Sequence, residues 1–339
     1  MSTQTIEYQS PTTYRDRTVR LLSILVKTGP AIGLALVVLI FTILKPHSFL
    51  TVDNWQRILT LTTVVGVAAL GMTIVIISGG IDLSVGATMA LTTVVVATLL
   101  VQGWSPLVAA LGGIAVGIGI GMFIGALVVF VDLAPFVVTL GLWGGLRGLA
   151  KGVAHEQAVY PPHETWLVPI NHMLPPDKAW MIVPIAVWLM LILSIMTAVL
   201  LRFTRFGRHV FAIGSNEQTA RLCGVPVART KILVYMLGQM FAALAGVLLF
   251  SFLTEGDPTT ANGKELDVIA AVVIGGASLS GGQGTIAGSL VGALLMTVIA
   301  NGCGKLDIPN WVQEMVTGGI IILAAIFDRL KRGKLPRVL

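Results

Sequence analysis

Few polar side chains that could perform chemistry lie beside the long apolar runs of this chain. Asp82 stands between two charge-free runs, 58–81 and 83–131, and Ser84 can share its hydrogen bonding. An ionisable residue at membrane depth is costly and is therefore a candidate functional residue. An aspartate also suits the start of a helix at the membrane boundary, where the helix dipole favours negative charge. The sequence leaves both interpretations of Asp82 open.

Two glycine pairs, Gly79-Gly80 and Gly275-Gly276, each end an apolar run. The eight-residue segments that they open, GGIDLSVG and GGASLSGG, agree at five of eight positions. A helix break at membrane depth is tolerated only where protein or water surrounds it, and breaks in both halves of a transporter point to its pathway. Glycines also permit close helix packing, so the pathway and the packing interpretations both remain.

A third polar group opens the apolar run at 265–277. Glu265 and Asp267 begin this run, and Asn262 precedes it. Acidic side chains stabilise the first turn of a helix, which accounts for both carboxylates without a ligand. Alternatively, these three residues lie at the outer mouth of a pathway and meet solute hydroxyl groups or a partner protein.

The sequence contains no motif for catalysis, for a metal or for a cofactor. The histidines and acids of segment 151–178 lack the spacing of a zinc site. There is no G-x-x-x-x-G-K-[ST] phosphate loop, since the Gly-Lys pairs are followed by Glu or Leu. If ATP drives this protein, another polypeptide must bind the nucleotide.

The segment 202–231 is basic and polar, with apolar stretches of membrane length on both sides. It carries one acid, Glu217, and six basic residues: Arg202, Arg205, Arg208, Arg221, Arg229 and Lys231. This composition favours a position in water rather than in lipid.

Inside this segment the sequence predicts a helix at about 216–223. Ser215 and Gln218 have the spacing of a capping box at the helix start. Gly224 suits the left-handed residue after the helix, and Pro226 prevents its continuation. A helix of about two turns is marginal alone in water, so we expect this one to pack on a partner.

Composition places the chain in a membrane. Of its 339 residues, 55% are hydrophobic and 11% are charged, and the mean hydropathy is +0.90. Soluble domains carry about 25% charged residues. We expect an all-α, polytopic membrane bundle of about ten helices, since about 20 apolar residues span a bilayer. The expected spans are 28–44, 58–78, 87–101, 107–131, 135–150, 179–201, 232–253, 265–277, 285–301 and 311–327.

The basic residues predict the orientation of this bundle. Fifteen of the 22 Lys and Arg residues lie in the tail 1–27, the segment 202–231 and the tail 329–339. Because basic loops stay in the cytoplasm, we expect both termini and the segment 202–231 inside, 151–178 as an outer loop and 28–328 as one transmembrane domain. The basic residues that give the net charge of +6 lie between the expected spans, so this charge does not indicate nucleic-acid binding.

Three ordered motifs carry a resemblance that covers about residues 48–328. NEQTARLCG at 216–224, GGIDLSVG at 79–86 and ELDVIAAVVIGGASLSGGQGTIAG at 265–288 are similar to segments of ABC importer permeases for ribose, arabinose, galactose and similar monosaccharides. The resemblance implies that 202–231 is a cytoplasmic coupling loop contacting an ATPase subunit. The coupling residues that it indicates are Ser215, Asn216, Glu217, Gln218, Ala220, Arg221 and Gly224.

The resemblance further implies a permease subunit that is not itself an enzyme, in the bacterial inner membrane. A second permease, a separate ATPase that binds ATP and a periplasmic sugar-binding protein are the expected partners. Two alternatives stay open. One is a permease of the same fold for another solute, such as an autoinducer, a nucleoside or a branched amino acid. The other is an ion-driven secondary transporter that uses Asp82.

Overall fold

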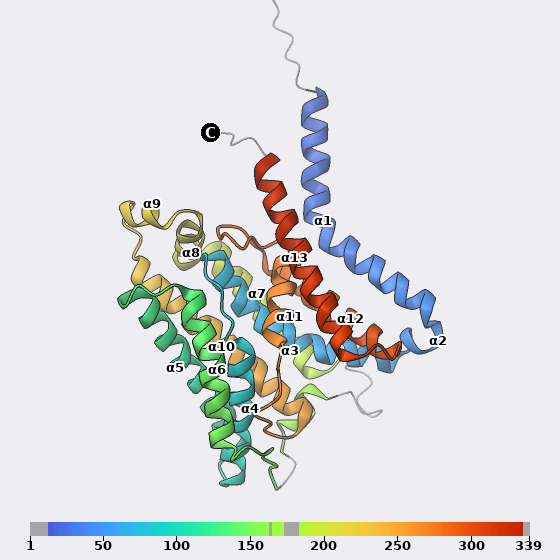
Figure 1. The fold of residues 1–339 in the computed structure, drawn as a ribbon, viewed down its shortest axis with the longest axis vertical. Coiled ribbons are helices and arrows are strands. Elements are labelled where there is room, and N and C mark those ends of the chain that lie inside the picture. Colours follow the sequence, from blue (N-terminus) through green and yellow to red (C-terminus); the bar gives the residue numbers. More distant parts are fainter. Residues whose placement is uncertain (1–12, 163–164, 173–182, 335–339) are drawn as a thin grey trace, which may run out of the picture.

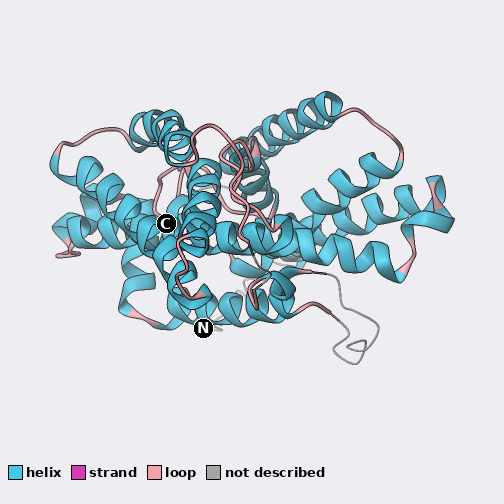
Figure 2. Cartoon of the chain, turned by 90° about the horizontal axis from the view of Figure 1, so that it is seen from below, coloured by secondary structure: helices cyan, strands magenta, loops and turns pink. Residues whose placement is uncertain are grey.

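The computed structural model describes residues 13–162, 165–172 and 183–334, and these are helices joined by loops (Figure 2). The elements are α1 Thr13–Leu44, α2 Pro46–Phe49, α3 Val52–Ile77, α4 Val85–Val101, α5 Pro106–Phe130, α6 Pro135–Val153, η1 Val168–Asn171, α7 Ile185–Phe203, α8 Arg205–Ser215, α9 Glu217–Leu222, α10 Val227–Leu253, α11 Lys264–Ile274, α12 Ile286–Lys305 and α13 Asn310–Lys334. The expected all-α class is confirmed.

Helix α3 is the centre of the bundle (Figure 1). It packs against α10, α12, α11 and α7, and its apolar residues from Val64 to Ile77 are nearly all buried. A helix that is apolar on every side is stable either inside a protein core or in membrane lipid, and α3 is enclosed by other helices. The remaining long helices therefore surround α3, and many of their outward side chains are large and apolar.

Helix α10 is held tightly between α5 and α3 by glycines. Gly117, Gly121 and Gly125 recur every four residues on α5, and a Cβ on any of them would meet α10 between residues 232 and 243. On the opposite side, a Cβ on Gly71 of α3 would lie 2.6 Å from the carbonyl oxygen of Gly238. Small residues at these positions let the helix backbones approach closely, as in other membrane helix pairs.

Replacing Gly121 with leucine is expected to destabilise the bundle by about 1–3 kcal/mol, because the new side chain would overlap the backbone of α10. Thermal unfolding of the purified protein in detergent measures the effect. Gly119→Leu is the matched control on the same helix, because no atom of the described residues outside that helix's own backbone lies within 4 Å of a Cβ at that position. Equal melting temperatures for the two variants would contradict the packing argument.

Most expected spans coincide with helices within a few residues, but three differences matter. Helix α1 begins at Thr13, so part of the expected tail 1–27 is helical, and α1 bends in Figure 1 as its internal Pro30 would cause. Helix α11 has 11 residues, too few to cross a bilayer at about 1.5 Å per residue. Helix α8, inside the expected loop 202–231, was not predicted.

Within the residues that the structure describes, five helices are both long and apolar enough to cross a membrane: α3, α5, α7, α10 and α12. A span count of about ten therefore stays a prediction. Figure 1 places the first described turns of α1, the last described turns of α13 and α9 towards the same end of the molecule. Their orientation to the cytoplasm also stays a prediction.

Candidate coupling site

The helix α8 supports the predicted coupling helix. Thr204 begins it, accepting a hydrogen bond from the backbone N–H of Gly207 at 3.2 Å. Gly207, Val210 and Ile213 recur every three residues and form its buried face, while Arg205 and Arg208 are exposed. This alternation was not recognised because basic residues and glycines dominate the segment. The consequence is a surface helix that leads directly into α9.

The start of α9 lies one residue later than predicted. Ser215 is the last residue of α8, and Asn216 takes an extended conformation between the two helices. The Oδ1 atom of Asn216 accepts from the backbone N–H of Thr219 at 2.9 Å, so Asn216 is the N-cap. The predicted cap at Ser215 is wrong, because α8 continues through that residue and asparagine caps a helix equally well. Gln218 is exposed.

The end of α9 is as predicted. Gly224 has a left-handed backbone with φ of +79°. Its N–H donates to the carbonyl oxygen of Arg221 at 3.1 Å, and the N–H of Val225 donates to that of Ala220 at 3.0 Å. These two bonds form a Schellman motif, which satisfies the last carbonyl groups of the helix. Ala220 is buried with Ile213 and Val227, so α9 rests on α8 and on the start of α10.

Asn216→Ala is expected to lower the local stability of α9 by about 1 kcal/mol, since the N–H of Thr219 loses its acceptor. Hydrogen exchange of the peptide that covers 216–223 measures the change. Ser215→Ala is the control, because Ser215 is exposed and is not the cap. Faster hydrogen exchange in Ser215→Ala than in Asn216→Ala would show that Ser215, and not Asn216, is the N-cap of α9.

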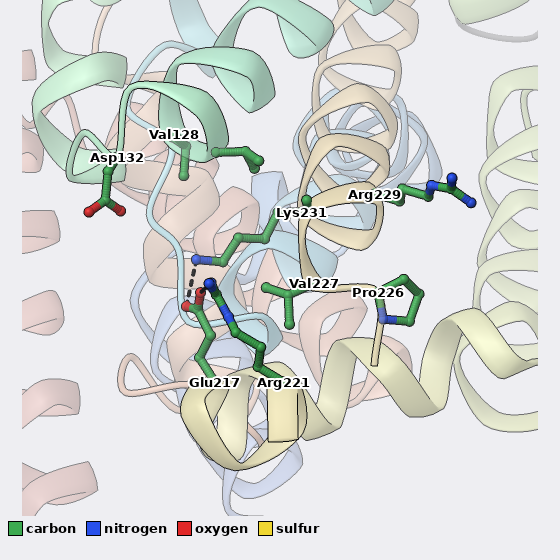
Figure 3. A pocket seen from close by; sticks show the side chains of 10 residues that line it. Val128, Asp132, Glu217, Arg221, Pro226, Val227, Arg229 and Lys231 are labelled. Carbon is green, nitrogen blue, oxygen red and sulfur yellow. Dashed lines mark hydrogen bonds and ion pairs between the residues drawn. The ribbon is translucent and has the colours of Figure 1, made fainter. Parts of the chain in front are cut away.

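A cavity of about 370 Å³ lies between α9, the end of α5 and the start of α10 (Figure 3). Glu217 reaches into it and accepts from Lys231 at 2.6 Å and from Arg221 at 3.3 Å. Arg229 points away from Glu217 in Figure 3, and Asp132, with φ of +56°, lies on the α5 side. Glu217 therefore ties the short α9 to the long α10.

The outer side of α9 faces away from this cavity. Leu222 is 89% exposed, and Cys223 beside it is also exposed. A helix of six residues with an exposed leucine gains little stability from its own chain. This side of α9 carries the most exposed large apolar side chain of the predicted coupling loop 202–231.

The two glycine-marked breaks end their helices in the same way. Gly79 follows α3 with φ of +86°, and Gly276 follows α11 with φ of +94°. In each break the two N–H groups at the turn donate to the last carbonyl groups, forming a Schellman motif. The left-handed residue is the first glycine of Gly79-Gly80 and the second of Gly275-Gly276. The sequence alignment of the two segments pairs Gly79 with Gly275. The left-handed turns instead pair Gly79 with Gly276, one residue further along.

The breaks meet each other and α8 at a backbone junction. The N–H of Gly282 donates to the carbonyl oxygen of Ile77 at 2.8 Å. A Cβ on Gly214 of α8 would collide with that oxygen and lie 2.6 Å from the nitrogen of Gly282. A Cβ on Gly281 would lie 2.9 Å from the Cα of Gly79. The three motifs of the sequence analysis thus converge where α8 leads into α9.

Asp82 lies in the first break and is fully buried. Its Oδ1 atom accepts from the N–H and the hydroxyl of Ser84 at 2.9 and 2.6 Å, and its Oδ2 atom accepts from the amide of Gln239 at 2.6 Å. The same amide donates to the hydroxyl of Ser84 at 2.8 Å. Asp82 therefore organises the turn before α4 and fastens it to α10, with both carboxylate oxygens occupied.

The other predicted residues lie at the opposite end of α11, away from the junction. Asn262, Glu265 and Asp267 line a cavity of about 320 Å³ with polar residues of α13: Asn310, Gln313, Glu314 and Thr317. Glu265 is buried and accepts from the indole N–H of Trp143 at 3.0 Å, while Asp267 accepts from Lys264 at 2.8 Å. Glu265 also lies against Gly86 at the start of α4, so this second group borders the segment that contains Asp82 and Ser84.

Comparison with known proteins decides the family. Residues 54–325 match the family described as branched-chain amino acid transport system, permease component. The chain belongs to this permease family. The ribose import permease of Bacillus subtilis is 38% identical over 305 residues, covering 90% of this permease and 93% of that one. The L-arabinose ABC transporter permease of Azospirillum brasilense is 35% identical, covering 84% and 83%. The xylose transport system permease of Haemophilus influenzae is 31% identical, covering 90% and 96%.

Sequence reasoning missed three residues that position this site in the permease: Gln239, Lys231 and Gly214. Gln239 is the one amide in the charge-free run 232–254, a signal that was available. Lys231 was counted only as one of six basic residues, and Gly214 carried no signal at all. Gly214 matters because of which backbones approach it, and that depends on tertiary packing.

Proposed function

We propose that this chain is the membrane-spanning permease subunit of a bacterial ABC importer for a monosaccharide or a similar polyol. The observation that carries the proposal is the near full-length similarity to permeases named for ribose, L-arabinose and xylose. The protein acts in the inner membrane, and a separate subunit binds and hydrolyses ATP.

In this proposal, α9 is the contact with the ATPase. The helix is capped at both ends, and it presents Leu222 and Arg221 to the surroundings. An exposed leucine beside a cation fits an apolar groove with an acidic rim. When ATP draws the ATPase domains together, α9 moves with them, and the opening of the pathway alternates.

The remaining partners follow from the same assignment. A second permease, either a copy of this chain or a close relative, completes the pathway, and a periplasmic binding protein delivers the sugar. The 320 Å³ cavity beside α11 supports contact with a polyol, because carboxylate and amide side chains there can accept and donate hydrogen bonds to hydroxyl groups. Asn262, Glu265 and Asp267 are the residues in question.

The exposed coupling helix allows a direct test of ATPase binding. We would tag the permease, extract it from native membranes in mild detergent, and compare the wild type with Leu222→Asp. The variant should fold normally, because Leu222 is 89% exposed, and should lose an ATPase that co-purifies with the wild type. ATPase binding should also slow maleimide labelling of the exposed Cys223, while the buried Cys303 reports whether the fold is intact. Co-purification that survives Leu222→Asp would contradict docking through α9.

Transport by the reconstituted assembly tests the solute. Proteoliposomes containing the permease, the ATPase and the binding protein are supplied with radiolabelled ribose, arabinose or xylose. ATP-dependent uptake of at least one of them is expected. Uptake only of a nucleoside or a branched amino acid would overturn the sugar assignment. Uptake by the permease alone, abolished by an uncoupler while ATP is maintained, would establish ion-driven transport instead.

A further inference from the structure

One face of α10 joins the coupling helix to the first helix break. Lys231, Tyr235 and Gln239 recur every four residues and therefore lie on the same side of the helix. They cover about 12 Å along its axis at 1.5 Å per residue. We call these three residues the relay face. Lys231 contacts the coupling helix α9, and Tyr235 and Gln239 contact the first helix break.

The first contact is at the coupling helix. The ammonium of Lys231 donates to the carboxylate of Glu217 at 2.6 Å, and the Lys231 side chain is 20% exposed. This ion pair crosses from α9 to α10, whereas the pair of Glu217 with Arg221 stays within α9. Lys231 therefore carries the ionic link between α9 and the body of the bundle.

The other two contacts are at the break. The hydroxyl of the buried Tyr235 lies where a side chain on Gly80 would stand, 2.5 Å from its Cβ position. The amide of Gln239 donates to Asp82 and to Ser84. Residues 81–83 lie outside α3 and α4, so their position depends on side-chain contacts around them rather than on helix hydrogen bonds. Gln239 thus fixes where the break lies relative to α10.

The helix between these contacts is packed on both flanks. Gly121 and Gly125 of α5 and Gly71 of α3 bring neighbouring backbones against residues 232–238. A tightly packed helix moves as a unit instead of deforming along its length. A displacement imposed on Lys231 therefore reaches Gln239, together with the segment that Gln239 holds.

We propose that the relay face sets the position of the break 78–84 according to the position of α9, with Lys231 and Gln239 as positioning residues for transport. The inference rests on the proposed function and adds to it the elements that connect ATPase movement to the membrane pathway. Asp82 and Ser84, which Gln239 contacts, are the residues of the break that a displacement of α10 would move. Neither positioning residue needs to touch the solute.

The test is the number of solute molecules transported per ATP hydrolysed by the complete assembly in proteoliposomes. Lys231→Met keeps the length of the side chain and removes its charge. It should lower this ratio by about ten-fold, a typical size for coupling between distant sites, while ATP hydrolysis continues. Lys231→Arg keeps the ion pair and should keep the ratio. Arg229→Met is the matched control two residues away, because Arg229 is exposed and forms no ion pair within the described residues.

A double-variant cycle separates a shared link from two independent effects. Gln239→Met should also lower the ratio, and Lys231→Met combined with it should lower the ratio no further, because both interrupt one connection. Effects that multiply would overturn the inference. A wild-type ratio in Lys231→Met would also overturn the inference. Because the Lys231 side chain is partly exposed, this variant is expected to fold, so its ratio can be measured. A wrong sugar assignment would show differently, as a wild-type assembly that couples ATP to another solute, and the ratio can then be measured with that solute.

Discussion

Replacing Gly214 with valine is expected to reduce transport by ten-fold or more, as the coupling segment would separate from the helix breaks. The valine Cβ would stand against the carbonyl oxygen of Ile77 and 2.6 Å from the nitrogen of Gly282. Both are backbone atoms that already bond to each other at 2.8 Å, so neither can move aside cheaply. Overpacking of this kind costs about 1–3 kcal/mol, and tilting α8 out of the junction relieves it. ATP-dependent uptake in proteoliposomes, measured beside the melting temperature, checks the result.

A matched variant keeps this prediction specific to the junction. Gly224→Ala strains a left-handed residue, so Gly119→Val is the better control: it adds the same side chain at a helix position where none of the described neighbouring elements comes within 4 Å. The control should transport at the wild-type rate. If Gly214→Val also transports normally with an unchanged melting temperature, α8 does not press on the breaks, and the junction has no mechanical importance.

Local chemistry made the coupling helix predictable from sequence. Gly224 and Pro226 mark the end of α9 wherever the segment lies in the fold, because the left-handed turn and the missing N–H are local properties. The start was less certain, because Ser215 and Asn216 are both good caps. Only the buried face of α8 decides between them, since it extends that helix through Ser215.

The helix breaks show where sequence reasoning stops. Their glycines identify the ends of α3 and α11 correctly, yet the same motif cannot reveal that Gly282 bonds to Ile77 more than two hundred residues away. Such contacts depend on how α3 and α11 pack around their neighbours. The same limit applies to Asp82: two interpretations stood open, and its bond to Gln239 was visible only once α10 lay beside the break.

Asp82→Ala is expected to destabilise the protein by on the order of 3 kcal/mol and to stop transport. The N–H and hydroxyl of Ser84 and the amide of Gln239 would be left buried without their acceptor, and each unsatisfied group costs about 1–3 kcal/mol. Asp82→Asn should be far milder. Its oxygen can still accept from Ser84, and its amide can donate to the Gln239 oxygen, which has no hydrogen-bond partner among the described residues, after the Gln239 amide turns over and gives up its bond to Ser84. Thermal unfolding and uptake, measured on both variants, test this order.

The two Asp82 variants also decide between the two kinds of transport that the sequence left open. If Asp82 only fastens the break to α10, hydrogen bonding is sufficient, and Asp82→Asn should transport with ATP as its energy source. A carboxylate that carries a coupling ion must change its charge, which asparagine cannot do. A stable Asp82→Asn protein without transport would therefore favour ion coupling. Uptake by that variant, lost only in Asp82→Ala, would assign Asp82 to the architecture of the break.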